Sequence, residues 1–162
     1  MTKVASTDTR AVETNSVSWL LCRAGWLLAL PLESVGEIVP LLPIEPLPGM
    51  PRFIAGLCII RGSPVPVVNA ELLFGGRHTR ASRLVTITIG DRLIALAVQD
   101  VLGVRSIDAV SLSALPPLLQ EAAGDAVQAI RTLDGELLLV LSQARLVPES
   151  VLESIASTGA GS

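Results

Sequence analysis

Residues 127–141 read VQAIRTLDGELLLVL, two apolar runs joined by Asp134-Gly135. An Asp-Gly pair between apolar runs is the strongest short-range signal for a β-hairpin, because the tight turn needs a positive φ at both central positions. Similar hairpin patterns cover residues 84–98, which turn at Gly90-Asp91, and residues 17–30. The 11 prolines and 13 glycines interrupt any long helical pattern. These features predict a mostly β chain.

The chain also contains an internal echo. Residues 26–38 (WLLALPLESVGEI) align without gaps on residues 92–104 (RLIALAVQDVLGV), and residues 56–74 align on residues 129–147. The order is the same in both halves, although two apolar strands also resemble each other by chance. We interpret the pattern as two related half-units, each a small curved sheet, because neither buries enough apolar surface alone. They would span about residues 17–75 and 83–148.

Composition limits the class of protein. The chain has 162 residues, of which 50% are hydrophobic and 17% charged, so it can bury a sizeable core. Four aromatic side chains and a net charge of −3 offer neither stacking platforms nor a phosphate-binding field, so we expect no nucleic-acid partner. No apolar run is long enough for a membrane span.

The ends of the chain are more polar than its body. Residues 1–16 lack the apolar core of a secretory signal, which predicts a flexible N-terminal tail and a cytoplasmic protein. Residues 149–162 are expected to form a C-terminal tail. The folded domain is predicted to span residues 17–148.

The sequence carries no arrangement of residues typical of catalysis. It has a single His, and no nucleophile elbow, P-loop or pair of catalytic acids is present. Cys22 and Cys58 form no CxxC motif and have the pattern of small buried apolar residues. We therefore expect no enzyme, no catalytic residue, no cofactor and no metal.

One cation stands out. Residues 53–70 read FIAGLCIIRGSPVPVVNA, and their only charge is Arg61, beside Gly62 at a turn between strands. A buried unpaired charge costs several kcal/mol, so Arg61 must meet water, a carboxylate or a partner. It is the first candidate for a binding site. Alternatively, Arg61 pairs with Glu37 or covers a sheet edge.

Several ordered motifs resemble the CheW family of chemotaxis adaptor domains. The family's V-x-E-I segment is matched by Val35-Gly36-Glu37-Ile38, and its FI-x-G-x-x-x-x-RG segment by residues 53–62. The resemblance covers about residues 17–148. It implies an all-β fold, with two pseudo-repeated five-stranded SH3-like β-barrels packed around a shared apolar core and a few short helices.

The resemblance also implies a function. Such domains are non-enzymatic adaptors that couple the cytoplasmic hairpin of a chemoreceptor to the regulatory domain of a CheA-type histidine kinase, and that pair with other CheW-like domains. The receptor hairpin lies in a groove between the barrels. In this chain the expected partner-binding residues are Val35, Glu37, Ile38, Gly56, Leu57 and Arg61. Arg61 would orient the partner and the apolar members would supply contact area, unless those members belong to the core.

The chain departs from the family pattern after its long strands. Asn69 and Ser142 stand where Asp is usual, and Glu71 stands where Arg is usual. Asn69 and Ser142 still suit the start of a short helix. A partner contact made by the usual Arg is not expected here, which suggests a specialised pathway, for example one linked to pili.

Two alternatives to the adaptor remain open. One is a domain whose barrels hold a hydrophobic small ligand, although barrels of about sixty residues fill with side chains. The other is a domain that mainly self-associates or binds a partner other than a receptor.

Overall fold

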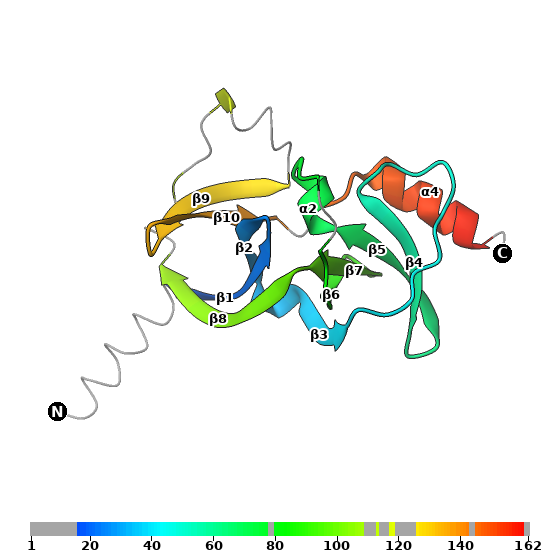
Figure 1. The fold of residues 1–162 in the computed structure, drawn as a ribbon, viewed down its shortest axis with the longest axis horizontal. Coiled ribbons are helices and arrows are strands. Elements are labelled where there is room, and N and C mark those ends of the chain that lie inside the picture. Colours follow the sequence, from blue (N-terminus) through cyan, green and yellow to red (C-terminus); the bar gives the residue numbers. More distant parts are fainter. Residues whose placement is uncertain are drawn as a thin grey trace.

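Two five-stranded sheets make up the body of the molecule (Figure 1). The computed structural model describes residues 16–77, 80–108, 113, 117–118, 126–142 and 145–160. Sheet A has the order β8-β1-β2-β10-β9 and sheet B the order β3-β6-β7-β5-β4. The strands of sheet A are β1 (Ser16–Ala24), β2 (Trp26–Pro31), β8 (Asp100–Asp108), β9 (Val127–Leu133) and β10 (Glu136–Leu141). Those of sheet B are β3 (Val35–Pro40), β4 (Ile54–Ile60), β5 (Ser63–Asn69), β6 (Arg83–Ile89) and β7 (Arg92–Val98). The all-β class with two five-stranded units is confirmed.

The two sheets are topological copies of each other. If strands β1 to β5 are matched in order to β6 to β10, the strand order of sheet A becomes that of sheet B. Sheet A nevertheless contains β1 and β2 from the first half of the chain and three strands from the second. The expectation that each half forms its own sheet is therefore wrong. The chain crosses to the other sheet after β2 and again after β7, so the halves exchange three strands each.

Strand register supports the internal repeat. In sheet A the parallel pair β2–β10 places Ala29 opposite Val140, and in sheet B the parallel pair β5–β7 places Val67 opposite Ala95. These are the pairs that the two sequence echoes make equivalent, since they align Ala29 with Ala95 and Val67 with Val140.

Both faces of the central strands are buried. On β2, Leu28 and Leu30 point into the core shared by the two sheets, whereas Leu27 and Ala29 point into the interior of sheet A. Strand β7 likewise divides its side chains between the shared core and the interior of sheet B. Strands that are apolar on both faces read as continuous apolar runs instead of alternating patterns. This explains the run LLALP at the end of β2.

The predicted hairpins are present. The turn between β9 and β10 has φ values of 51° at Asp134 and 79° at Gly135, and the turn between β4 and β5 has 51° at Arg61 and 80° at Gly62. Two successive positive φ values are those of a type I′ turn, whose twist matches that of the flanking strands. Gly62 thus supplies the positive φ that a turn between these strands needs.

Both cysteines are buried thiols, as expected. Cys22 has no exposed surface, and burial, reinforced by the nearby charge of Asp100, raises its pKa to about 12. Burial also raises the pKa of the Cys58 thiol. Protonated, shielded thiols are poor nucleophiles and poor metal ligands. These two side chains therefore act as core residues.

Short helices follow two of the strands, β2 and β5. The 3-10 helix η1 (Leu32–Ser34) precedes β3, and α2 (Ala70–Leu73) follows β5. The Asn69 side chain accepts a 3.0 Å hydrogen bond from the backbone N–H of Leu72, as the sequence predicts for a helix cap. After Ser142, residues 143 and 144 lie outside the described residues. Within the described part of the chain, no helix has the length and apolar character needed to cross a bilayer.

The C-terminal segment corrects a prediction. Residues expected to form a tail instead begin helix α4 (Glu149–Ala160), which packs on sheet B (Figure 1). Leu152 and Ile155 are each 4% exposed and belong to the shared core. Pro148 suits a helix start, but the apolar positions fill little more than one turn and Gly159 weakens the helical pattern. The predicted N-terminal tail, apart from Ser16, lies outside the described residues.

Candidate partner-binding site

Arg61 lies at the tip of the β4–β5 hairpin and binds Glu37 on β3. Its Nε lies 3.0 and 3.2 Å from the two carboxylate oxygens of Glu37, and its Nη2 lies 2.9 Å from Oε2. The guanidinium side chain is 80% exposed and the carboxylate side chain 30% exposed. Arg61 therefore does both things that the sequence allowed: it pairs with Glu37 and it remains open to solvent.

The pair changes the titration of both groups. Hydrogen bonding from Arg61, and then its positive charge, lower the pKa of Glu37, while the carboxylate raises the pKa of Arg61. Exposed ion pairs contribute little to stability because water and salt screen them. Two parallel N–H···O bonds nevertheless fix the direction of the guanidinium. The pair thus joins the edge strand β3 to the β4–β5 turn and holds a cation at a defined place.

The Val35–Ile38 segment is a bulge held by Thr86 on β6. Strand register shifts between Val35 and Ile38, and the backbone N–H of Glu37 donates a 2.7 Å hydrogen bond to Thr86 Oγ1. A Cβ at Gly36 would lie 2.6 Å from that same oxygen, so only glycine allows this approach. The Val-Gly-Glu-Ile segment is therefore a bulge that is fixed to β6 and that directs the Glu37 side chain toward Arg61.

Ile38 belongs to an apolar edge that continues the shared core outward. It is 43% exposed, and the residue opposite it on β6 is Val85, a fully buried member of that core. Val104 on β8 is 54% exposed and pairs with Leu20, which lies in the same core. Residues opposite each other in an antiparallel pair point to the same face. Ile38 and Val104 thus extend one core at the edges of the two sheets.

Val35 and Val101 lie near Ile38 and Val104 on the same two edge strands. Both are half-buried and pack against the shared core, one on β3 and one on β8. We call the four residues Val35, Ile38, Val101 and Val104 the apolar rim. Their two pairs occupy equivalent positions of the repeat, since the echo aligns Val35 with Val101 and Ile38 with Val104.

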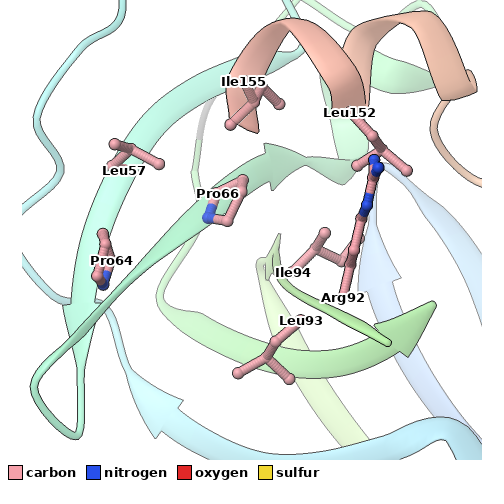
Figure 2. A pocket seen from close by; sticks show the side chains of 8 residues that line it. All are labelled: Leu57, Pro64, Pro66, Arg92, Leu93, Ile94, Leu152 and Ile155. Atoms are coloured by element: carbon pink, nitrogen blue, oxygen red, sulfur yellow. The ribbon is translucent and has the colours of Figure 1, made fainter. Parts of the chain in front are cut away.

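Gly56 and Leu57 have other surroundings. Gly56 is buried with a φ of 144°, and a Cβ there would lie 2.0 Å from the carbonyl oxygen of Glu45. The segment that crosses it is held by two hydrogen bonds between Glu45 and Leu57, of 2.7 and 2.8 Å. Leu57 is half-buried and lines a groove beside α4 (Figure 2). The structure thus gives Gly56 a packing role and sets Leu57 beside α4.

Comparison with known proteins identifies the family. The family model described as CheW-like domain matches residues 19–151. The chain belongs to the CheW-like domain family. A crystal structure of the scaffolding protein TtCheW from Thermoanaerobacter tengcongensis is similar to it, with a TM-score of 0.71 and 24% identity over 84% of this chain and 95% of that one. At this identity the likeness concerns the fold alone. No curated protein matches the chain.

This CheW-like domain departs from the family pattern at Glu71, whose position the structure explains in part. Its side chain is 8% exposed and lies between two glycines: a Cβ would be 3.0 Å from Oε1 at Gly25 and 2.4 Å from Cγ at Gly76. Oε2 is buried and has no hydrogen-bond partner among the described residues. The carboxylate is therefore enclosed by the protein instead of being presented to a partner.

Sequence reasoning missed the β8 half of the apolar rim. The signal was available, because the echo that revealed the repeat also aligns Val101 and Val104 with the two candidate residues on β3. It was overlooked because apolar residues in a β chain read as ordinary core positions. In this CheW-like domain, exposure at the sheet edge distinguishes Val104 from a core residue.

Proposed function

We propose that this chain is a non-enzymatic adaptor that couples the cytoplasmic hairpin of a chemoreceptor to a CheA-type histidine kinase, in chemotaxis or a related pathway such as pilus control. Membership of a family of chemotaxis scaffold and adaptor domains supports the general role. The observation that carries the proposal for this chain is the apolar rim: exposed Ile38 and Val104 occupy equivalent places in the two repeats.

The receptor hairpin is proposed to lie against the apolar rim. An amphipathic helical hairpin presents apolar side chains on one stripe of each helix, and two such stripes match two equivalent strand edges. Ile38 and Val104 supply exposed area, while Val35 and Val101 supply the half-buried floor. Glu37, the residue before Ile38, holds Arg61 in place, and the charge of Arg61 selects the orientation of the bound hairpin.

A hydrophobic ligand inside the barrels has less support. The interior of sheet A is occupied by Trp19, Leu21, Leu138 and their neighbours, and that of sheet B by Ile60, Val65, Leu84 and theirs. Narrow barrels fill in this way because side chains meet at the axis. The adaptor role is therefore the function that the chain supports best.

Binding to a receptor hairpin and a kinase regulatory domain tests the proposal. Val104→Asp and Arg61→Glu should each weaken co-sedimentation with the receptor hairpin, by about tenfold or more if the residue is a hot spot. Leu137→Asp, which changes another exposed apolar residue of sheet A, is the matched control and should bind as the wild type does. All three variants should remain folded, and Arg61→Glu should lower the melting temperature only by the small amount expected for the loss of an exposed ion pair. Wild-type affinity in both site variants would refute the proposed surface.

A further inference from the structure

A groove outside the barrels runs between the β4–β5 hairpin, the start of β7 and helix α4 (Figure 2). Its volume is about 320 Å³. Among the described residues, seven that line it are apolar and one is charged; they are Leu57, Pro64, Pro66, Leu93, Ile94, Leu152, Ile155 and Arg92. The groove is thus an apolar trough with a single guanidinium in its wall.

The guanidinium of Arg92 is incompletely satisfied. Its Nη2 lies 3.5 Å from Glu149 Oε1 on α4, at the long end of an ion pair. Its Nη1 is buried and has no hydrogen-bond partner among the described residues. The Glu149 side chain is 70% exposed, so it holds Arg92 only through a solvent-screened contact. A buried donor without an acceptor is costly, and an anion that reached it would gain a charge-assisted hydrogen bond.

We propose that this groove binds a small amphiphilic monocarboxylate, with the apolar body against Leu57, Pro66 and Leu152 and the carboxylate on Arg92 in place of Glu149. Size favours a small molecule, because sites for such ligands occupy about 300–1,000 Å³ and this groove lies at the lower end. Charge favours an acid, because among the described lining residues the one charged group is a cation. The site is separate from the apolar rim and does not depend on the adaptor role.

The exposed apolar surface beside the groove is consistent with this ligand. Leu93, at one end of the trough, is 40% exposed, and its side chain is drawn beside Ile94 in Figure 2. Ile59, on the same face of β4 as Leu57, is 62% exposed. An acyl or aryl body laid along the trough would cover apolar surface that water now contacts.

Competition between Glu149 and the ligand gives a specific test. Octanoate is the probe, titrated into the full-length protein and followed by calorimetry and by chemical-shift changes, with 1-octanol as the uncharged comparison. Glu149→Gln removes the competing carboxylate and should raise octanoate affinity about twofold to fivefold, as expected for loss of an exposed ion pair. It should leave octanol binding unchanged. If Glu149 merely held α4 in place, its substitution would change the affinities for octanoate and octanol alike.

Removal of the cation is the second arm. Arg92→Met keeps an apolar stem of similar length and should lower octanoate affinity about tenfold, while octanol binding stays within about twofold. Arg83→Met, at an exposed arginine on β6, is the control and should bind both probes as wild type does. If Arg92→Met fails to fold, the Glu149→Gln arm alone decides. Absence of saturable octanoate binding to the wild type, or equal affinity in wild type and Glu149→Gln, would overturn the proposal.

Discussion

Replacing Gly56 by alanine should unfold the chain at a distinctly lower temperature, although the change adds one methyl group. The new Cβ would lie 2.0 Å from the carbonyl oxygen of Glu45 and 2.9 Å from the Cα of Pro46, both backbone atoms that cannot rotate away. The crossing segment must therefore move, and both hydrogen bonds between Glu45 and Leu57 are lost. A positive φ at a non-glycine residue adds strain.

The expected magnitude follows from these two terms. Two hydrogen bonds contribute about 1 kcal/mol each, and the strained φ costs about 1–2 kcal/mol, so the free energy of unfolding should fall by about 3–4 kcal/mol. For a domain of this size, that loss lowers the melting temperature by roughly 6–16 °C. Calorimetry or thermal circular dichroism measures it directly.

Gly49→Ala is the matched control. Gly49 also has a positive φ, of 76°, but a Cβ there would contact nothing within 4 Å, so only the backbone strain of about 1–2 kcal/mol applies. Gly56→Ala should therefore cost at least twice as much as Gly49→Ala. Equal losses of stability would show that the crossing of Glu45 over Gly56 does not hold the fold, and the packing role assigned to Gly56 would be refuted.

Two further predictions concern the β4–β5 turn. Gly62→Val should lower the melting temperature, because Gly62 has a φ of 80° that a β-branched residue adopts only with strain, and a wild-type melting curve would contradict this reading. Arg61→Gln should lower the melting temperature at neutral pH, and the difference from wild type should disappear in acid. The sign follows from Glu37: Arg61 lowers its pKa, so the stabilisation is present above the ordinary carboxyl pKa and is lost as the pH falls through the lowered value. A difference that stays constant down to strongly acidic pH would exclude the ion pair as its cause.

The hairpins and the repeat could be predicted from sequence because their causes are local. Asp134-Gly135 and Arg61-Gly62 adopt the same turn, with φ values within a degree of each other, because the turn geometry demands them. The Asn69 cap was predictable for the same reason, since it satisfies a backbone N–H three residues away. A family resemblance then supplied the number of strands in each unit.

The exchange of strands between the halves could not be predicted in this way. The echoes show which segments are equivalent, but equivalent strands can pair within one half or between halves with the same local sequence. The choice is made by long-range contacts, such as Val67 opposite Ala95. Burial of Leu152 and Ile155 on α4 is equally non-local, because it depends on the shared core that both sheets build from distant segments.

The candidate site was predictable in its charges and less so in its apolar part. Arg61 and Glu37 stood out because isolated charges in apolar sequence need a partner, and the structure pairs them. Gly56 was assigned to binding from the family motif, whereas its surroundings are the backbone of Glu45. An isolated charge indicates a counter-charge wherever that lies in the chain, whereas nothing in the sequence indicates that the backbone of Glu45 crosses Gly56.

The exchanged strands have a consequence for synthesis on the ribosome. When the first 77 residues have left the exit tunnel, β3 still lacks β6, and β5 still lacks β7. Only local hairpins can form at that stage. Sheet B, whose strands β3 to β7 are consecutive in the chain, can close once β7 has emerged, whereas sheet A stays open until β8 to β10 join β1 and β2. Strands β1 and β2 must therefore keep their apolar side chains from aggregating while all of sheet B is made, and the shared core closes only after β10 has joined them.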